Sequence, residues 1–86
     1  MRANVLFFAN LKDRAGRQRL EVELPAGACV EDLKQHLMVL FPDLEVLLES
    51  TLVSVNQQYA MDADLIPEGA EVALFPPVSG GAASPT

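Results

Sequence analysis

The segment of this chain best suited to take part in chemistry carries almost no side chains. Gly80 and Gly81 lie close to the C-terminus and follow the prolines Pro76 and Pro77. Glycine has no Cβ, so such a segment could pass through a narrow channel into the active site of another protein. The prolines favour an extended backbone, which would stiffen the exit from the domain. Taken alone, the pattern is equally typical of an ordinary flexible chain end.

The other reactive side chains form weaker patterns. Cys29 precedes a stripe of apolar residues that predicts a helix, and a thiol at a helix N-terminus can be activated. The simpler interpretation is that Cys29 is a small, half-buried structural residue. His36 has no second histidine and no cysteine at ligand spacing, which argues against a metal site. Asp62 and Asp64 fall in a segment expected to be a loop, where acids are usually solvated. Without a nucleophile–histidine–acid set or a phosphate-binding glycine loop, we expect no intrinsic enzymatic activity and no bound cofactor.

Length and charge narrow the function further. The 86 residues fit one domain, and a net charge of −6 argues against binding to nucleic acid or an anionic membrane. All six Lys and Arg residues lie in the first 34 positions. Residues 35–86 contain Asp and Glu but no Lys or Arg. This acidic half is either a solvating surface or one that meets a basic partner. A single cysteine excludes an internal disulfide and, with no apolar run long enough for a signal or a span, predicts a cytoplasmic protein.

Hydropathy periodicity predicts the elements that must position the tail. We expect strands at residues 3–8, 19–24, 52–55, 59–61 and 71–75, a helix at residues 30–40 and a short helical turn at 44–49. The first run is apolar throughout, as in a strand buried on both faces near the middle of a sheet. Residues 10–18 are polar and contain Gly16, which predicts a turn.

These elements predict an α+β fold in which a mixed sheet of four to five strands packs on one main helix. One helix covers only one face of such a sheet. The other face, including Phe75, is then only partly shielded, and an exposed apolar patch on a small protein usually marks a partner site.

Four stretches carry a resemblance that spans residues 3–81. They are VLFFANLKDRAG (5–16), GACVEDLKQHL (27–37), VSVNQQYA (53–60) and GAEVALFPPVSGG (69–81). In these residues the chain resembles the small, ubiquitin-like sulfur-carrier subunits of molybdopterin synthase. The resemblance implies a β-grasp domain at residues 1–76 and a flexible Gly-Gly carrier tail at 77–81. It leaves residues 82–86 as an extension that we expect to be disordered or removed.

The resemblance also implies a mechanism for molybdenum cofactor biosynthesis. An E1-like adenylyltransferase uses ATP to adenylate the C-terminal carboxylate of Gly81, and a sulfur donor converts it to a thiocarboxylate. The tail then enters the active site of the large synthase subunit, which supplies the catalytic residues. The residues that the resemblance assigns to partner binding are Phe75, Pro76, Pro77, Val78, Ser79, Gly80 and Gly81.

The sequence departs from that pattern after Gly81. With Ala82 attached, the Gly81 carbonyl is an amide and offers no carboxylate to adenylate. We favour a precursor that is cut after Gly81. A sequence artefact, or a β-grasp interaction module that has lost sulfur transfer, would also account for the five added residues. A carrier for thiamine, cysteine or tRNA thiolation, and a ubiquitin-like modifier of lysines, are further alternatives.

Overall fold

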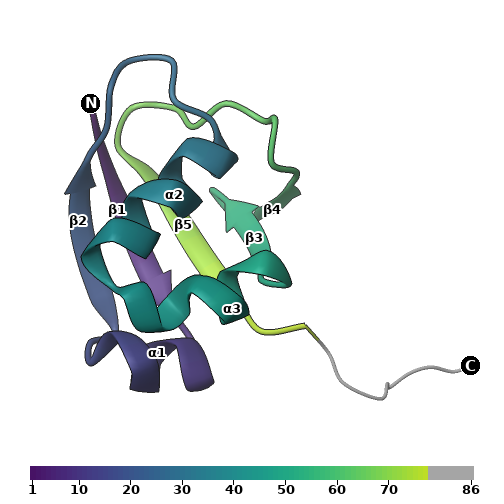
Figure 1. Ribbon diagram of the computed structural model, residues 1–86. Helices are drawn as coiled ribbons and strands as arrows, with labels where there is room; N and C mark the ends of the chain where they lie inside the picture. The colour runs from purple at the N-terminus through teal and green to yellow at the C-terminus, as the bar shows by residue number, and fades with distance from the viewer. Residues whose placement is uncertain (78–86) are drawn as a thin grey trace, which may run out of the picture.

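A mixed sheet of five strands forms the frame of the computed structural model, which describes residues 1–77 (Figure 1). The strands are β1 (Arg2–Phe7), β2 (Arg19–Glu23), β3 (Leu52–Val55), β4 (Gln58–Ala60) and β5 (Ala70–Phe75). Their order across the sheet is β2-β1-β5-β3-β4. β1 and β5 run parallel, and each of the other neighbouring pairs is antiparallel. The predicted α+β class and mixed sheet are confirmed.

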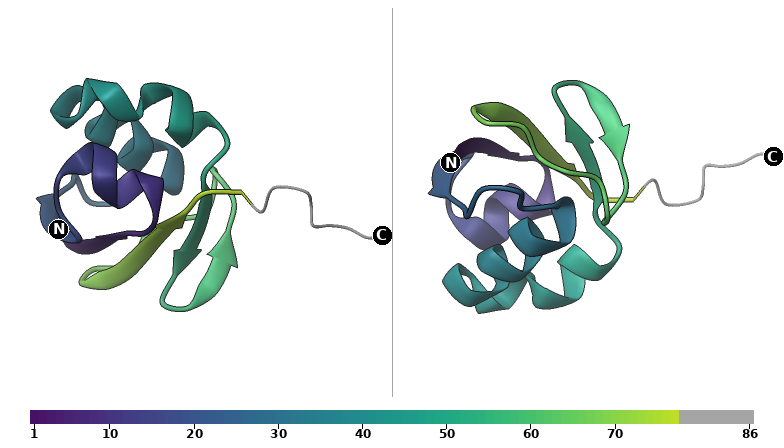
Figure 2. Two further views of the ribbon diagram at one scale, coloured as in Figure 1. Left: turned by 90° about the horizontal axis from the view of Figure 1, so that it is seen from below. Right: turned by 90° about the horizontal axis from the view of Figure 1, so that it is seen from above.

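The helices gather on one face of this sheet. They are α1 (Asn10–Ala15), α2 (Val30–Leu40), the 3-10 turn η1 (Pro42–Leu44) and α3 (Glu45–Glu49). In both views of Figure 2 the helices form one layer and β3, β4 and β5 lie on the other side. The predicted main helix at 30–40 and the helical turn at 44–49 are therefore confirmed, and one face of the sheet is left uncovered.

The hydrophobic core lies between α2 and the covered face. Ala3, Val5 and Phe7 alternate along β1 and are fully buried against Leu33 and Leu37 of α2. The ring of Phe7 meets that of Phe41 edge-on, with centroids 6.0 Å apart. Because each fully buried Leu or Phe side chain stabilises the fold by about 1.5–3 kcal/mol, this interface supplies most of the stability of so small a domain.

The start of α2 is fixed by local hydrogen bonds. Cys29 is the N-cap, and its backbone N–H donates to Asp32 Oδ2 at 3.0 Å. The thiol of Cys29 donates to the same oxygen at 3.4 Å. The next two backbone N–H groups donate to the carbonyl oxygens of Asp64 and Asp62, each at 2.9 Å. The helix ends before Pro42, since the residue before a proline avoids the α region.

The predicted turn at residues 10–18 is wrong, because most of this segment is the helix α1. Leu11 and Ala15 are four residues apart, lie on one helical face and are buried. Gly16 closes the helix in the left-handed conformation at φ 75°, and its N–H donates to the Lys12 carbonyl at 2.9 Å. Two apolar positions in a polar stretch therefore suffice for a helix when they face a core.

The prediction that the first strand is buried on both faces is also wrong. Asn4 and Leu6 of β1 are half-buried and Phe8 is exposed, because the helices cover only the other face. On α2, Leu40 is exposed, although the apolar spacing along residues 30–40 would place it on the buried side. The short strand β4 begins one residue earlier than predicted, at Gln58.

A two-residue turn joins β3 to β4. Val55 pairs with Gln58, and the residues between them, Asn56 and Gln57, have φ angles of 50° and 71°. Positive φ at both central positions matches the twist of a hairpin, and the second of these positions usually holds glycine. The predicted division into a domain at 1–76, a tail and an extension stays a prediction, since residues 78–86 lie outside those described.

Candidate functional site

The uncovered face of the sheet is apolar at one end. The strand register aligns Leu6 with Ala73, Ala73 with Ser54, and Ser54 with Tyr59, so one row crosses four strands. Phe8 and Phe75 follow at the ends of the parallel strands β1 and β5. These side chains line a hollow, and we call five of them the open-face patch: Leu6, Phe8, Tyr59, Ala73 and Phe75.

A stacked pair of aromatic rings holds the edge of this patch. The rings of Phe8 and Phe75 lie 5.0 Å apart between centroids, at an angle of 11°. The backbone N–H of Phe8 also donates to the Leu74 carbonyl at 3.3 Å. Such aromatic pairs contribute about 0.5–1.5 kcal/mol beyond area burial. The stack therefore fixes the last residue of β5, from which the tail departs.

Pro76 and Pro77 follow at once and end β5, because neither can donate to a neighbouring strand. Both line a second hollow on the helical side, together with the start of α1 and residues of α3 and its C-terminal turn. The predicted partner residues Phe75, Pro76 and Pro77 are thus brought together at the surface, between two hollows. Val78, Ser79, Gly80 and Gly81 lie outside the described residues.

Backbone strain is concentrated at the same place. Ala9 has φ 55° and ψ −130°, a conformation that L-residues seldom adopt. It joins Phe8, which lies in the open-face patch, to Asn10, which lines the second hollow. Strained backbone of this kind costs about 1–3 kcal/mol and persists only where the surrounding structure enforces it. The conformation of Ala9 therefore lowers the stability of the domain next to Pro76 and Pro77, where β5 ends.

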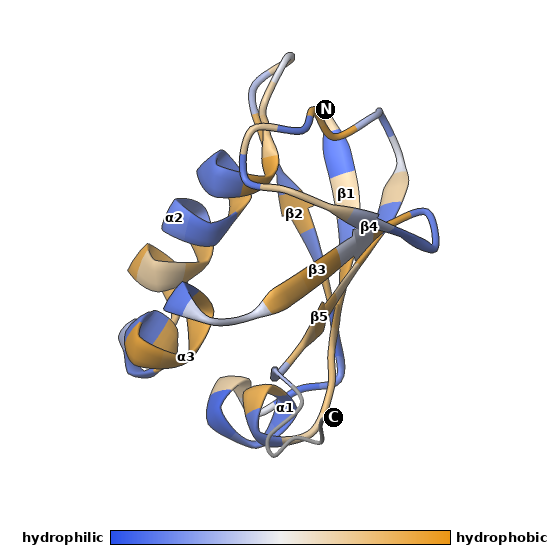
Figure 3. Ribbon diagram, turned by 90° about the vertical axis from the view of Figure 1, so that its right-hand side faces the viewer, coloured by the Kyte–Doolittle hydropathy of each residue, from blue (hydrophilic) through white to orange (hydrophobic). Residues whose placement is uncertain are grey.

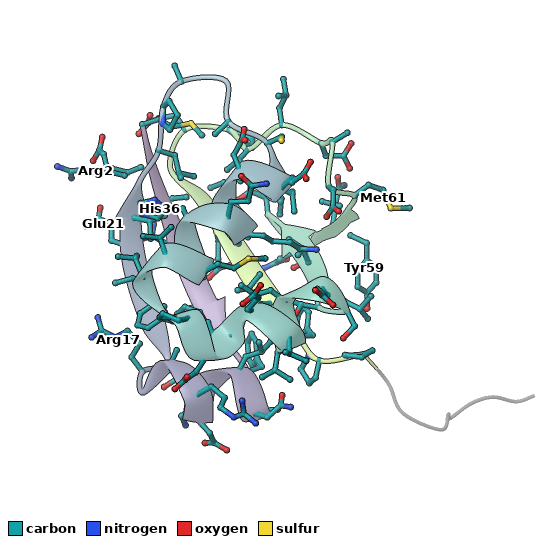
Figure 4. All side chains as sticks on the ribbon, viewed as in Figure 1. Arg2, Arg17, Glu21, His36, Tyr59 and Met61 are labelled. Carbon is teal, nitrogen blue, oxygen red and sulfur yellow. The ribbon has the colours of Figure 1, made fainter. Side chains whose placement is uncertain are left out.

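The far end of the uncovered face has a different character. Arg2 lies within 3.6 Å of both Glu21 and Glu23, and Glu21 pairs with Asn4 across the strands. Figure 4 shows Arg2 and Glu21 at one edge of the sheet and Tyr59 and Met61 at the opposite edge. Figure 3 shows β3 and much of β5 coloured as hydrophobic. A partner that buries apolar surface is accordingly favoured near the tail, not at the charged end.

The remaining candidates from the sequence have structural roles. Cys29 belongs to the cap of α2, and Asp62 Oδ1 accepts a hydrogen bond from Lys34 Nζ at 2.9 Å. Asp64 Oδ2 accepts one from the Met61 N–H at 2.7 Å, which shapes the loop before β5. His36 is half-buried on α2, and residues 1–77 contain no group of three His, Cys, Asp or Glu placed to hold a metal.

Of the five residues of the open-face patch, sequence reasoning singled out only Phe75. The apolar run places Phe8 only in a buried strand, and nothing in the sequence pattern selects Tyr59, whose side chain is 80% exposed. The alternation of β1 at Phe7 and Phe8 could have revealed the first, since adjacent strand residues face opposite sides. Within the described part of the chain, no helix is long and apolar enough to span a membrane.

Comparison with known proteins agrees with this geometry. The ThiS family matches residues 5–81, so the match ends at the second glycine. The molybdopterin synthase sulfur carrier subunit of Chlamydomonas reinhardtii is 35% identical over 94% of this chain and all of that protein. SAMP1 from Haloferax volcanii is 30% identical, with a TM-score of 0.83 over 94% of this chain and 100% of that one. The putative molybdopterin converting factor subunit 1 from Pyrococcus furiosus is 27% identical, with a TM-score of 0.82 over 91% and 99%.

More distant structures share the fold alone. One is the complex of subunits 1 and 2 of the molybdopterin-converting factor from Helicobacter pylori, at 20% identity and a TM-score of 0.67. Another is the ubiquitin of Caldiarchaeum subterraneum, at 16% identity and a TM-score of 0.62. The predicted ubiquitin-like β-grasp fold is confirmed.

Proposed function

The chain belongs to the ThiS family, and from that premise we propose that it carries sulfur on Gly81 as the small subunit of a molybdopterin synthase. The predicted role of a sulfur carrier in molybdopterin synthesis agrees with the relatives named as carrier subunits, of which this chain covers 100% in one case and 80% in another. A subunit of this kind delivers a group to a partner that holds the catalytic side chains. We place the carrier in the cytoplasm, since a lone cysteine suits a reducing compartment.

The chemistry needs a free carboxylate at Gly81. We propose that residues 82–86 are removed first, and the end of the family match at residue 81 supports this. An E1-like adenylyltransferase then joins the carboxylate of Gly81 to the α-phosphate of ATP and releases pyrophosphate. A sulfur donor displaces AMP from the acyl carbon and leaves a thiocarboxylate. ATP is bound by the activating partner and not by this chain.

The position of the tail carries the proposal. Phe75, the last residue of β5, is part of the open-face patch, and Pro76 and Pro77 extend the chain away from it. A partner that docks on the patch therefore contacts the chain at the end of β5, where the segment that leads to Gly81 begins. A few large side chains usually dominate the binding energy of an interface, and Phe8 and Phe75 are the large side chains that pack together in this patch. We propose that the large synthase subunit and the activating enzyme both dock here.

A second function is favoured by one comparison. The Haloferax volcanii protein, which is 30% identical to this chain, is a small archaeal modifier protein. A modifier uses the same adenylated carboxylate and transfers it to an amine. The other sulfur pathways would share the activation step and differ only in the acceptor.

Binding to the large subunit tests the docking surface. We expect Phe75→Ala to weaken binding of the 1–81 chain by roughly 30-fold or more, the loss typical of an interface hot spot. Val39→Ala is the control for loss of an apolar surface side chain elsewhere, because Val39 is 79% exposed and lies on α2. Equal affinities for both variants, measured by titration calorimetry, would show that the open-face patch is not the docking surface.

A further inference from the structure

The sheet has two edge strands, β2 and β4, and each is paired on one side only (Figure 1). Along an edge strand, alternate residues turn their backbone N–H and carbonyl groups outward, where another chain can pair with them. Proteins usually protect such an edge with charged side chains or cover it with another element. The two edges of this sheet differ in that protection.

The edge of β2 is protected by charge. Just after this strand, the N–H of Leu24 donates to the Met1 carbonyl at 2.8 Å, toward β1. Because the direction of the backbone groups alternates along a strand, the groups that face outward belong to Arg19, Glu21 and Glu23. All three residues are charged and exposed. A strand that paired at this edge would have to accommodate a charged side chain at every outward position.

The edge of β4 carries no charge. The N–H of Asn56 donates to the Glu71 carbonyl at 2.8 Å, toward β5. The same alternation directs the N–H of Ser54 toward β5, so Tyr59, which lies opposite Ser54, turns its own N–H and carbonyl outward. The strand consists of Gln, Tyr and Ala, and Tyr59 is 80% exposed. Tyr59 therefore offers one backbone donor and one acceptor to an added strand.

Exposed apolar side chains surround this edge. Two further hollows meet at β4, and Tyr59 lines both of them. Leu65 lines one, and Leu52 and Met61 line the other; all three side chains are exposed. Figure 4 shows Tyr59 and Met61 at the same outer edge of the sheet. Because Tyr59 also belongs to the open-face patch, the apolar surface continues from that patch to the edge of β4.

The charged side chains around the edge determine the charge that a partner needs. The three hollows that Tyr59 lines contain the acids Glu71, Asp64 and Asp62 and the base Lys34. Lys34 Nζ already lies 2.9 Å from Asp62 Oδ1, whereas neither Glu71 nor Asp64 has an ion pair among residues 1–77. A segment that carries Lys or Arg complements these two acids, and a second copy of the same edge would repel them.

We propose that β4 accepts an extended, basic segment of the large synthase subunit as a sixth strand of the sheet. The segment pairs with the backbone of Tyr59, places apolar side chains beside Leu52 and Met61, and presents Lys or Arg to Glu71 and Asp64. Main-chain hydrogen bonds and alternate side-chain contacts are the usual basis of such strand addition. This inference rests on the docking in the proposed function and adds a contact that docking on the open-face patch does not require.

Amide hydrogen exchange tests the added strand. It is measured by NMR on the 1–81 chain, which keeps every described helix and strand because β5 ends at Phe75. We expect the N–H of Tyr59 to exchange roughly tenfold more slowly when the large synthase subunit is bound, since one hydrogen bond of about 1.4 kcal/mol gives that ratio. The N–H groups of Glu21 and Glu23, at the other edge, should not change. An unchanged rate at Tyr59 in the complex would overturn the inference and leave the docking on the open-face patch standing.

Two substitutions at Tyr59 separate the backbone contact from the ring. Tyr59→Ala and Tyr59→Pro both remove the ring, but only the proline variant removes the N–H, which faces outward and is not needed within the sheet. We expect Tyr59→Pro to bind the large subunit roughly tenfold more weakly than Tyr59→Ala, whereas Glu21→Pro and Glu21→Ala should bind equally. Equal affinities of the two Tyr59 variants would contradict the added strand. If the unsubstituted 1–81 chain does not bind either, the docking in the proposed function fails as well.

The charge of the segment is tested at Glu71. Glu71→Gln keeps the shape of the side chain and should weaken binding of the large subunit by roughly two- to fivefold at low salt. The difference should disappear at about 1 M salt, which screens exposed charges beyond about 3 Å. Glu49→Gln on α3 is the control, because Glu49 lines none of the hollows at Tyr59. A Glu71→Gln variant that binds as tightly as the unsubstituted chain at low salt would refute a basic segment.

Discussion

Phe7 and Phe8 are neighbours in the sequence, yet they belong to two regions with opposite roles. Phe7 is 0% exposed and packs under the helices against Phe41. Phe8 is 38% exposed and stacks on Phe75 at the uncovered face. The pleat of the strand sends adjacent side chains to opposite sides of the sheet. The same residue type therefore holds the fold together in one position and presents a surface in the next.

The same contrast between a buried and a surface side chain occurs in β5, which runs parallel to β1. Leu74 is fully buried in the core, and Phe75, the next residue, lies in the open-face patch. A domain this small has one core, so every side chain given to a partner surface is lost to stability. The covered face should accordingly respond to mutation in its free energy of unfolding, and the uncovered face in its binding.

The largest effect on stability is expected at the covered face. Phe7→Ala should lower the free energy of unfolding by about 3–5 kcal/mol, because it removes a fully buried ring and leaves a cavity. Urea unfolding followed by circular dichroism measures this directly. A loss below about 1 kcal/mol would mean that the core is not centred on β1 and α2.

The neighbouring substitution should separate the two regions. Phe8→Ala is expected to cost only about 0.5–1.5 kcal/mol of stability, the contribution of an aromatic stack. Its affinity for the large synthase subunit should nevertheless fall by roughly 30-fold, as for an interface anchor. The comparison breaks down if Phe8→Ala unfolds as readily as Phe7→Ala, or if it binds like the wild type.

A smaller effect is expected at a buried polar group beside the second hollow. Thr51 is buried, and its hydroxyl donates to the Leu47 carbonyl at 2.6 Å. Thr51→Val keeps the shape but removes the donor, and should cost about 1 kcal/mol. Thr51→Ser keeps the hydroxyl and serves as the control for the hydrogen bond. A greater loss in the serine variant would assign the effect to the methyl group instead.

The smallest effect, and the only gain, is expected at the strained residue between the two regions. Ala9→Gly should stabilise the domain by about 0.5–1 kcal/mol, because glycine adopts positive φ without strain but gains unfolded-state entropy. Ala60→Gly in β4 is the matched control, since Ala60 is not among the residues of positive φ, and it should destabilise by about the same amount. Thermal unfolding distinguishes them, and loss of stability in both would refute strain at Ala9.

Long periodic segments could be predicted from the sequence, and contacts between distant segments could not. The alternation at residues 19–24 and the helical stripe at 30–40 each depend on local spacing, and both elements are predictable for that reason. The helix α1 escapes prediction because only Leu11 and Ala15 mark its buried side. Local strain at Ala9 leaves no trace in residue types.

The site divides in the same way. The approach to the tail through Phe75, Pro76 and Pro77 could be predicted, because the motif is continuous in the sequence. The stack of Phe8 on Phe75 could not, since it depends on the parallel pairing of β1 with β5, segments at opposite ends of the domain. Tyr59 joins the patch only through the hairpin register of β3 and β4.

The most direct test of the account is activation of the chain with and without residues 82–86. The 1–81 and 1–86 chains are each incubated with the E1-like adenylyltransferase, ATP and a sulfur donor, and their intact masses are measured. We expect that only the 1–81 chain, and not the 1–86 chain, gains mass, by the difference between one sulfur and one oxygen atom. The change should be located at Gly81. A thiocarboxylate on the intact 1–86 chain, or none on the 1–81 chain, would contradict the claim that sulfur is carried on Gly81.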